Sequence, residues 1–570
     1  MMIVLHRIFL LFTTSLKDIV SVAIFLLCLA FAWYRPQFWG SFFDAIERTG
    51  AAIARRKGLA MVLLATATIA IRLSLLWVLP IPVPRDHDEF SYLLAGDTFA
   101  HGRLTNPTHP LWVFFDTIHV NQQPTYMSKY PPAQGAFLAA GQLLGNPWFG
   151  VLLSVGIMCA AILWMLQGWF PSRWALLGGV LVMFRLGIFT VWMNTYWGGA
   201  VAAIGGALVV GAMPRIMRYS RMRDAALLVL GAGILANSRP LEGIVLCLPV
   251  IVVLLAWFFS KKSPSWRVMF PRVILPFCVV GILCGIFIGY YNWRGTGKPT
   301  LFPYVVNERT YLSTPTLFWE PVRPPMHYSN PQLDAFYNVW ARDLWLEGRV
   351  DSIRHAVRLL FLDLIRVVYF FMWPELLVPF IMLPWLLRDR RIRFLIVQSA
   401  ISLSGMLLVP WYQTQYIGPL TATLFALPTQ AIRHLRQFHY GGRPVGIGLS
   451  RVIVLAVIFL GPYHVHVEPF GHPPPTPIEY RAVFERRLKQ IPGEHLVIVR
   501  YDVSLRKGGN GPEWVYNDAD IDRAKVVWAR EIPGVDIRPL LDYFRGRQVW
   551  IVEPDAVPPR IAPYPESSPR

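Results

Sequence analysis

Charged residues are scarce in this chain, and their scarcity excludes an ordinary soluble domain. Of the 570 residues, 15% are charged and 54% are hydrophobic, whereas a typical soluble domain carries about a quarter charged residues. Many apolar runs approach the roughly 20 residues that a helix needs to cross a bilayer. The composition therefore predicts a polytopic membrane protein.

Cysteine is also scarce, and its placement argues against disulfides and structural zinc. No C-x-x-C spacing occurs and no histidine lies nearby, so the thiols are expected to pack as small hydrophobic side chains. An internal repeat, which transporters often show, is not visible either. The cysteines all lie inside apolar runs, at Cys28, Cys159, Cys247, Cys278 and Cys284.

Acidic residues are outnumbered by basic ones, 34 Asp and Glu against 54 Lys and Arg, for a formal net charge of +20. An excess of basic residues indicates a nucleic-acid partner only when the basic residues cluster on a polar domain. Here the basic residues cluster in short connections between apolar runs, as they do on the cytoplasmic side of membrane proteins. We therefore predict no nucleic-acid partner and attribute the charge to membrane topology.

The apolar runs predict a mainly α fold with about 12 membrane spans. The first run is interpreted as a retained helix because no convincing small-residue cleavage site accompanies it. A further apolar stretch at 135–146 is too short to span and is expected to lie along the interface. The predicted spans cover about 19–34, 59–80, 147–168, 174–194, 198–213, 224–237, 241–259, 272–291, 362–387, 393–410, 415–432 and 450–464.

The basic clusters predict the orientation of these spans. The loops 81–134 and 292–361 and the tail from about 465 fall on the opposite side from the clusters, which we predict to be extracytoplasmic, in an inner (plasma) membrane protein. With the boundaries above, all the clusters share the side that the positive-inside rule assigns to the cytoplasm: 55–57, 215–223, 261–272, 388–393 and 433–443.

The tail predicts a small extracytoplasmic α/β domain. A proline-rich linker at 471–477 precedes a helix expected at 537–545 and buried strands expected at 495–501, 524–529 and 548–552. The chain then divides into three predicted domains: 1–58, an N-terminal span with its cytoplasmic connection; 59–464, a transmembrane domain that includes loop 81–134; and 465–570, the α/β domain.

The first extracytoplasmic loop opens with the acidic sequence PRDHDEF at 84–90. Asp86 and Glu89 fit a capping box at the start of a helix, and such a box stays open as an explanation of the whole cluster. The capping box does not involve Asp88, and ionisable groups near a bilayer are costly and usually functional. Asp88 is therefore the leading candidate for chemistry.

Several cations accompany this acid on the same predicted side. Lys129 lies beside two prolines at the far end of the loop, where a snorkelling membrane anchor is the alternative interpretation. Arg239 lies in a turn between two predicted spans, and a local ion pair with Glu242 is the competing interpretation there. Arg294 and Lys298 follow a later span and are weaker candidates.

The motifs at the two ends of this loop resemble those of a known family. The sequence DEFSY at 88–92 matches the D-E-x-x-Y pattern of GT-C membrane glycosyltransferases of the protein O-mannosyltransferase and aminoarabinose transferase-like superfamily, glycosyltransferase family 39-like. The sequence KYPP at 129–132 resembles the family's K-P-P element, from which Tyr130 is a departure. The resemblance covers about 60–465 in layout and is motif-level only within 85–135.

The resemblance implies a GT-C fold and an inverting glycosyltransferase that moves a hexosyl or pentosyl group from a polyprenyl-phosphate carrier to an extracytoplasmic lipid, glycan or protein acceptor. An acceptor alcohol needs a base, the role expected of Asp88, with Glu89 orienting it or binding acceptor. The leaving phosphate needs cations. The residues expected to bind substrate are Tyr92, Lys129, Tyr130, Arg239, Glu242, Arg294 and Lys298.

No cofactor or metal is assigned, although the sequence DHD at 86–88 offers oxygen and nitrogen ligands and a divalent cation stays an open alternative. Two functions of other classes also stay open. One is a transporter or flippase of lipid-linked glycans. The other is a non-catalytic membrane protein that displays its C-terminal domain.

Overall fold

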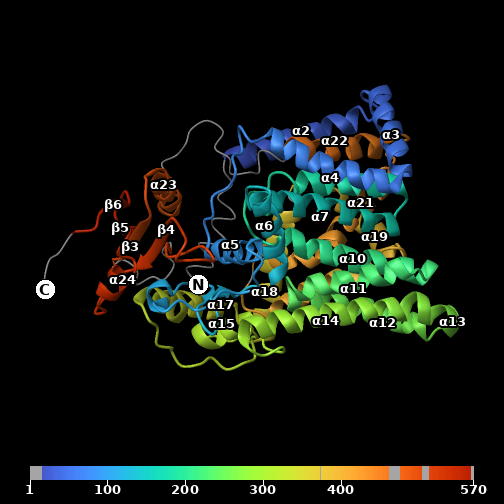
Figure 1. The fold of residues 1–570 in the computed structure, drawn as a ribbon. Coiled ribbons are helices and arrows are strands. Elements are labelled where there is room, and N and C mark those ends of the chain that lie inside the picture. Colours follow the sequence, from blue (N-terminus) through green and yellow to red (C-terminus); the bar gives the residue numbers. More distant parts are fainter. Residues whose placement is uncertain (1–15, 373, 412, 461–475, 503–512, 566–570) are drawn as a thin grey trace.

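A computed structural model of the chain describes residues 16–372, 374–411, 413–460, 476–502 and 513–565. Figure 1 shows long helices packed side by side in one part and a small sheet at the left of the view. The α-helices are α2 (Leu16–Tyr34), α3 (Gly40–Arg55), α4 (Lys57–Ser74), α5 (His87–Ala100), α6 (Pro132–Leu143), α7 (Trp148–Trp169), α8 (Ser172–Arg185), α9 (Val191–Asn194), α10 (Gly199–Tyr219), α11 (Met222–Ala236), α12 (Pro240–Phe258), α13 (Trp266–Met269), α14 (Leu275–Thr296), α15 (Pro303–Tyr311), α16 (Pro331–Asp334), α17 (Arg342–Gly348), α18 (Ile353–Met372), α19 (Leu383–Arg388), α20 (Arg393–Gly405), α21 (Thr421–Leu435), α22 (Val445–Leu460), α23 (Pro477–Gln490) and α24 (Arg538–Tyr543).

Small residues let these helices approach closely. α10 opens with GAVAAIGGALVVGA and packs against α7, α11 and the 3₁₀ segment η6 (Thr414–Leu420). A Cβ atom added at Gly206 would lie 1.8 Å from the carbonyl oxygen of Pro419, and one at Gly231 would lie 2.7 Å from that of Gly205. Membrane helices associate through small residues in this way because lipid offers no hydrophobic drive between them.

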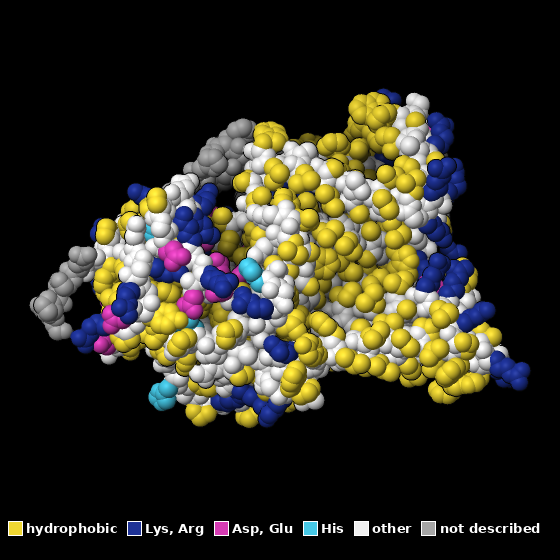
Figure 2. Space-filling view, viewed as in Figure 1, with side chains coloured by type: hydrophobic (Ala, Val, Ile, Leu, Met, Phe, Trp, Pro, Cys, Tyr) yellow, Lys and Arg dark blue, Asp and Glu magenta, His cyan; other side chains and the backbone are white. Residues whose placement is uncertain are grey.

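The helical part has the properties of a membrane protein. Among the described residues, five helices are long and apolar enough to cross a bilayer: α4, α7, α10, α12 and the continuous segment Trp266–Thr296. The helix pair Val378–Arg388 and Arg393–Leu408, bent by 113°, would make a sixth span. Hydrophobic side chains cover much of this part's surface in Figure 2. The structure thus confirms a mainly helical membrane fold but not the expected count of about 12 spans.

Two of the predicted spans are wrong as single helices. The run 362–387 divides into α18 and α19, since Pro374 and Pro379 lie between them and proline cannot continue a helix. The run 174–194 divides into α8 and the short α9, with the turn 186–190 between them. The stretch 135–146, expected at the interface, largely forms α6, which packs against α5 and α7.

The C-terminal part forms a four-stranded sheet in the order β4–β3–β5–β6. β3 pairs in parallel with β4 and β5, while β6 pairs antiparallel with β5. The strands expected from the sequence are present, and the predicted linker 471–477 lies largely outside the described residues. The strands are β3 (His495–Val499), β4 (Val526–Arg530), β5 (Gln548–Glu553) and β6 (Arg560–Pro563).

One face of this sheet packs on the first loop of the helical part. Leu496 and Ile498 of β3 share a hydrophobic cluster with Phe90 of α5, while the alternate residue Val497 packs with Phe484 of α23. Successive strand residues point to opposite faces, so β3 is buried on both. The sheet therefore supports α5 from the side away from the helices.

Candidate active site

α5 begins at the acidic cluster because Asp86 and Glu89 form the predicted capping box. One oxygen of Glu89 accepts the backbone N–H groups of Arg85 (3.1 Å) and Asp86 (3.3 Å), and the other accepts that of Tyr196 (3.0 Å). Glu89 is 1% exposed. Because both oxygens bind backbone amides, Glu89 anchors α5 to the turn before α10.

A short hairpin faces the first turns of α5. Strands β1 (Val120–Asn121) and β2 (Met127–Ser128) pair antiparallel with Val120 opposite Ser128, so the flanking residues His119 and Lys129 lie close together. The hydroxyls of Ser91 on α5 and Ser128 lie 2.8 Å apart and join the two elements. The hairpin thus brings two basic side chains to the start of α5.

The D-E-x-x-Y spacing has a direct structural explanation. Residues 88 and 92 are four apart and lie on one face of α5. The Tyr92 ring stacks on that of Tyr130 at 4.4 Å, and the Tyr130 hydroxyl donates to Asp88 Oδ1 at 2.6 Å. Tyr92 is buried and supports Tyr130 from behind. Tyr130, the departure from the family pattern, therefore positions the Asp88 carboxylate.

Asp88 is surrounded by donors and positive charge. Its Oδ1 also lies 2.6 Å from His119 Nδ1. Burial alone would raise the pKa of Asp88, but His119, the Lys129 ammonium and the Tyr130 hydroxyl prevail and hold that pKa well below its usual range. Asp88 is therefore ionised at neutral pH.

His119 is the residue that the sequence did not reveal. Its φ of 64° lies in the left-handed region, where a non-glycine residue costs on the order of 1–3 kcal/mol. The conformation is held because the His119 carbonyl accepts from the Ser91 hydroxyl (2.6 Å) and the Lys129 N–H (3.3 Å), and its N–H donates to the Tyr337 hydroxyl (3.2 Å). No motif or spacing marks His119, since the hairpin alone brings it to Asp88.

The tautomer of His119 follows from its surroundings. Burial, together with the charge of Lys129, lowers the pKa of His119 to about 4, so the ring is neutral at pH 7. A neutral ring carries one N–H, which Nδ1 donates to the Asp88 carboxylate. His119 and Tyr130 thus both hold Oδ1 and fix the orientation of the carboxylate.

Asp88, His119 and Lys129 line a cavity of about 710 Å³ between the first loop and the helices. The turn before α12, the segments 304–320 and 336–344, and the residues just before η6 supply most of the other walls. The cavity unites five of the nine predicted site residues, Asp88, Lys129, Tyr130, Arg239 and Glu242, with further residues that include His119, Asn307, Trp340, Trp411 and Tyr416.

Two cations that line this cavity each make a cation–π contact with a tyrosine ring. The Lys129 ammonium lies 4.9 Å from the centre of the Tyr130 ring, and the Arg239 guanidinium lies 4.2 Å from that of Tyr416. Burial lowers the pKa of Lys129 to about 8, with Asp88 acting in the opposite direction, so the amine is mostly protonated at pH 7. No direct ion pair of Arg239 with Glu242 occurs among the described residues. Glu242 and Tyr416 act electrostatically on Arg239, and Asp88 acts on Lys129, so each cation faces the cavity with a partner beside it.

Arg294 and Lys298, also predicted to bind substrate, are not among the residues that line this cavity. On the last turns of α14, Asn292 and Gly295 face inward and are buried, which leaves Arg294 exposed on the other side. The helix then ends at Gly297 with a φ of 77°, and Lys298 follows it into solvent. Helix periodicity thus turns these cations away from the site.

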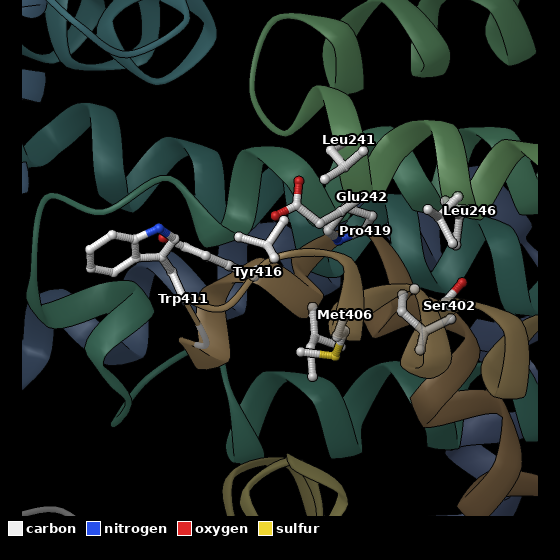
Figure 3. A pocket seen from close by; sticks show the side chains of 13 residues that line it. Leu241, Glu242, Leu246, Ser402, Met406, Trp411, Tyr416 and Pro419 are labelled. Carbon is white, nitrogen blue, oxygen red and sulfur yellow. The ribbon is translucent and has the colours of Figure 1, made fainter. Parts of the chain in front are cut away.

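A small apolar pocket continues from the cavity between α12 and α20. Figure 3 shows Trp411, Tyr416 and Glu242 toward one end and Leu246 and Ser402 toward the other. The first three residues line both spaces. This pocket is small, about 30 Å³, so it adds an apolar wall beside Glu242 to the larger cavity.

A divalent cation was left open as an alternative by the sequence, and such an ion would need a group of side chains that could bind it. Among the described residues, no group of three or more His, Cys, Asp or Glu side chains is arranged to hold a metal ion. In the DHD sequence, Asp86 belongs to the capping box of α5 and His87 Nδ1 lies 3.1 Å from the Tyr516 hydroxyl.

The C-terminal part also contributes to the site's support. The Tyr516 ring stacks on Phe90 of α5 at 4.4 Å, and its hydroxyl donates to the carbonyl of Ile118, next to His119 (3.2 Å). The N–H of Ala519 donates to Asp97 near the end of α5 (2.7 Å). The site is thus fixed by a region that lies outside the family resemblance.

No protein-family model matches the sequence, and no curated protein matches it. Among solved structures, ArnT from Cupriavidus metallidurans in the apo state is 13% identical, with a TM-score of 0.43, over 86% of this chain and 92% of that one. An Archaeoglobus fulgidus oligosaccharyltransferase tethered with an acceptor peptide is 12% identical, with a TM-score of 0.42, over 87% and 68%. AglB from Archaeoglobus fulgidus, in complex with an inhibitory peptide and a dolichol-phosphate, is 9% identical, with a TM-score of 0.37, over 87% and 69%.

Proposed function

We propose that the protein is an inverting GT-C-type glycosyltransferase that moves a sugar from a polyprenyl-phosphate carrier to an acceptor hydroxyl. One observation carries this proposal: a half-buried, ionised Asp88 shares a cavity with Lys129 and Arg239, beside a small apolar pocket. The 59–464 segment would form the catalytic domain in an inner (plasma) membrane, with the cavity and the 465–570 domain on the extracytoplasmic side. The acceptor is a lipid, a glycan or a protein.

The donor side of the reaction explains the cations. As the bond from the anomeric carbon to the phosphate oxygen breaks, both bonding electrons go to the phosphate, and its negative charge grows. Arg239 can hold two phosphate oxygens with its planar guanidinium, and Lys129 adds a point charge. The apolar side chains beside Glu242 would lie along the first part of the isoprenoid chain. The leaving phosphate is stable as an anion, so no general acid is needed.

The acceptor side explains why a carboxylate with a low pKa is an adequate base. The acceptor oxygen attacks the anomeric carbon from the face opposite the phosphate, which inverts its configuration. That oxygen becomes strongly acidic as its new bond forms, so its proton passes to Asp88 late in the step. A fully ionised Asp88 also stabilises positive charge that develops on the sugar ring. Holding Oδ1 with His119 and Tyr130 leaves Oδ2 for the acceptor.

The proposal is tested by supplying membranes that contain the full-length protein with a radiolabelled polyprenyl-phosphate sugar, and by comparing glycoconjugates of cells with and without the protein by mass spectrometry. Transfer of label to a non-carrier product, and loss of one glycoconjugate from the deficient cells, are expected. Movement of the carrier across the bilayer without consumption of its sugar would instead identify a flippase.

Replacing His119 with Asn is expected to lower kcat about tenfold, the equivalent of one hydrogen bond to a charged group. Asn tolerates the left-handed backbone, so the hairpin is kept. Because His119 helps to hold the pKa of Asp88 down, its loss raises that pKa, and the acidic limb of the pH–rate profile moves to higher pH. The wild-type limb lies below the usual range of a carboxyl group, so kinetics run from pH 8 down to the lowest pH at which the wild type stays active. A fall in kcat without a new loss of rate at acidic pH in the variant would contradict the role.

Replacing Lys129 with Arg is expected to remove an alkaline limb from the activity profile. The pKa of Lys129 is about 8, so above that pH the wild-type amine loses its proton and the cavity loses a cation. Arginine stays charged throughout this range. The measurement is transfer rate from pH 6 to pH 10. The control Lys298→Arg makes the same exchange outside the cavity and should keep the wild-type limb.

A further inference from the structure

A second cavity, of about 490 Å³, lies at the opposite end of the helical bundle from the candidate active site. The start of α4, the end of α7 and the α10–α11 connection form its walls. The other ends of α4, α10 and α11 lead to the first loop, the Tyr196 turn and the Arg239 turn, which belong to the first site. The two cavities are therefore separated by the length of these helices.

The lining of this cavity is strongly positive. It holds one carboxylate, Asp224, against five cations, and thus carries a formal excess of four positive charges. Figure 2 shows Lys and Arg side chains gathered along the same right-hand end of the bundle. Charges of one sign around a cavity raise the local concentration of anions. The five cations are Lys57, Arg215, Arg218, Arg221 and Arg223.

Arg215 lines the cavity, and its side chain is held in place by hydrogen bonds and by an aromatic ring. Its two terminal nitrogens donate to the carbonyl oxygens of Gly211 and Trp164, both at 2.6 Å, and its guanidinium lies 4.0 Å from the centre of the Trp164 ring. Nearer the rim, the Arg221 guanidinium lies 4.4 Å from the Tyr219 ring. Two of the arginines are thus held in place by aromatic rings before any ligand arrives.

Membrane topology explains why cations occur at this end, since the positive-inside rule predicts them there. It does not explain their convergence from three helices on one cavity, which brings like charges together at an energetic cost. The single buried carboxylate, Asp224, lies 3.9 Å from Arg223 and cannot offset the others. A bound polyanion would remove the repulsion.

We propose that this cavity binds a phosphate-bearing anion. The two sources with this chemistry are the headgroup of an anionic phospholipid and free phosphate. Basic pockets between membrane helices on the cytoplasmic side recognise lipid headgroups. Here Met61 and Leu227 add apolar lining, and Trp164 and Tyr219 are residue types found at membrane interfaces. The proposal does not depend on the glycosyltransferase activity.

The test uses full-length protein in phosphatidylcholine nanodiscs, into which phosphatidylglycerol is titrated, with retained lipid measured by mass spectrometry and Tm measured in parallel. A separate arm adds inorganic phosphate without phosphatidylglycerol. The test variant is the double substitution Arg218→Gln and Arg221→Gln. Both side chains are exposed, so folding should be preserved. The matched control is Arg267→Gln with Arg272→Gln, which removes the same charge near the same end but outside this lining.

The test variant is expected to bind phosphatidylglycerol at least tenfold more weakly than the wild type, since each cation near a membrane surface contributes about 1 kcal/mol. The control should bind within about twofold of the wild type. A rise in Tm with phosphate alone, lost in the test variant, would identify free phosphate as the ligand. Equal losses in both variants, or no binding of either anion by the wild type, would overturn the proposal.

Discussion

Replacing Asp88 with Asn is expected to lower sugar transfer by about 10²–10⁴-fold, the range that a positioned general base contributes. Asparagine has almost the same shape but cannot take the proton of the acceptor hydroxyl, and it removes the negative charge opposite the reacting sugar. Asp88 also raises the pKa of Lys129, so the substitution lowers that pKa, and binding of the phosphate-bearing donor should be kept at acidic pH, where Lys129 stays protonated. Transfer of radiolabelled sugar and equilibrium binding of the carrier together measure both effects.

The matched control for this substitution is Asp86→Asn. Asp86 lies two positions earlier and caps α5, a duty that Asn performs equally well. The control removes the same charge from the same turn and should keep most of the transfer activity. Equal losses at positions 86 and 88 would show that the electrostatic field of the cluster matters and that Asp88 has no special role.

Replacing Arg239 with Gln is expected to lower kcat/KM by about 10²–10³-fold, as the loss of one preorganised donor to a developing anion does. Arg239 is held over the Tyr416 ring and lines the cavity. Its loss removes charge that stabilises the phosphate in the donor and, more strongly, in the transition state. The KM for the donor should therefore rise, and kcat should fall. Steady-state kinetics with a water-soluble short-chain donor measure the two constants separately.

The control for this experiment is Arg294→Gln. The sequence placed Arg294 among the substrate-binding candidates, whereas the structure turns it to solvent on the last turn of α14. The control should keep kcat/KM within about twofold, the usual effect of an isolated surface charge. A loss comparable to that of Arg239→Gln would show that the phosphate binds at the outer end of α14 and would displace the proposed site.

Several parts of the site were predictable because their signals are local. A capping box can be recognised from four consecutive residues, and α5 begins at the position that this box predicted. The loop motifs were enough to select Asp88 and Lys129, which a single hairpin then brings together. The strands of the C-terminal sheet follow from short buried runs that are apolar on both faces.

Other parts needed contacts between distant segments. Glu89 was grouped with Asp88 because the two are adjacent, yet its second oxygen binds the N–H of Tyr196, more than a hundred residues away. The breaks within the predicted spans 174–194 and 362–387 show the opposite error, in which hydrophobicity outweighed the local signal of proline and turn residues. Apolar composition identifies a membrane segment but does not establish that it is one straight helix.

The sequence by itself determined that this chain is a helical membrane protein with a carboxylate and a lysine on one polar loop, because burial in lipid and helix capping depend on composition and near neighbours. Only the tertiary structure decided that His119 faces Asp88, that Arg239 joins them and that Arg294 does not. Those positions depend on how a hairpin, a helix terminus and the C-terminal sheet pack together. No spacing along the chain encodes the direction of a side chain across such an interface.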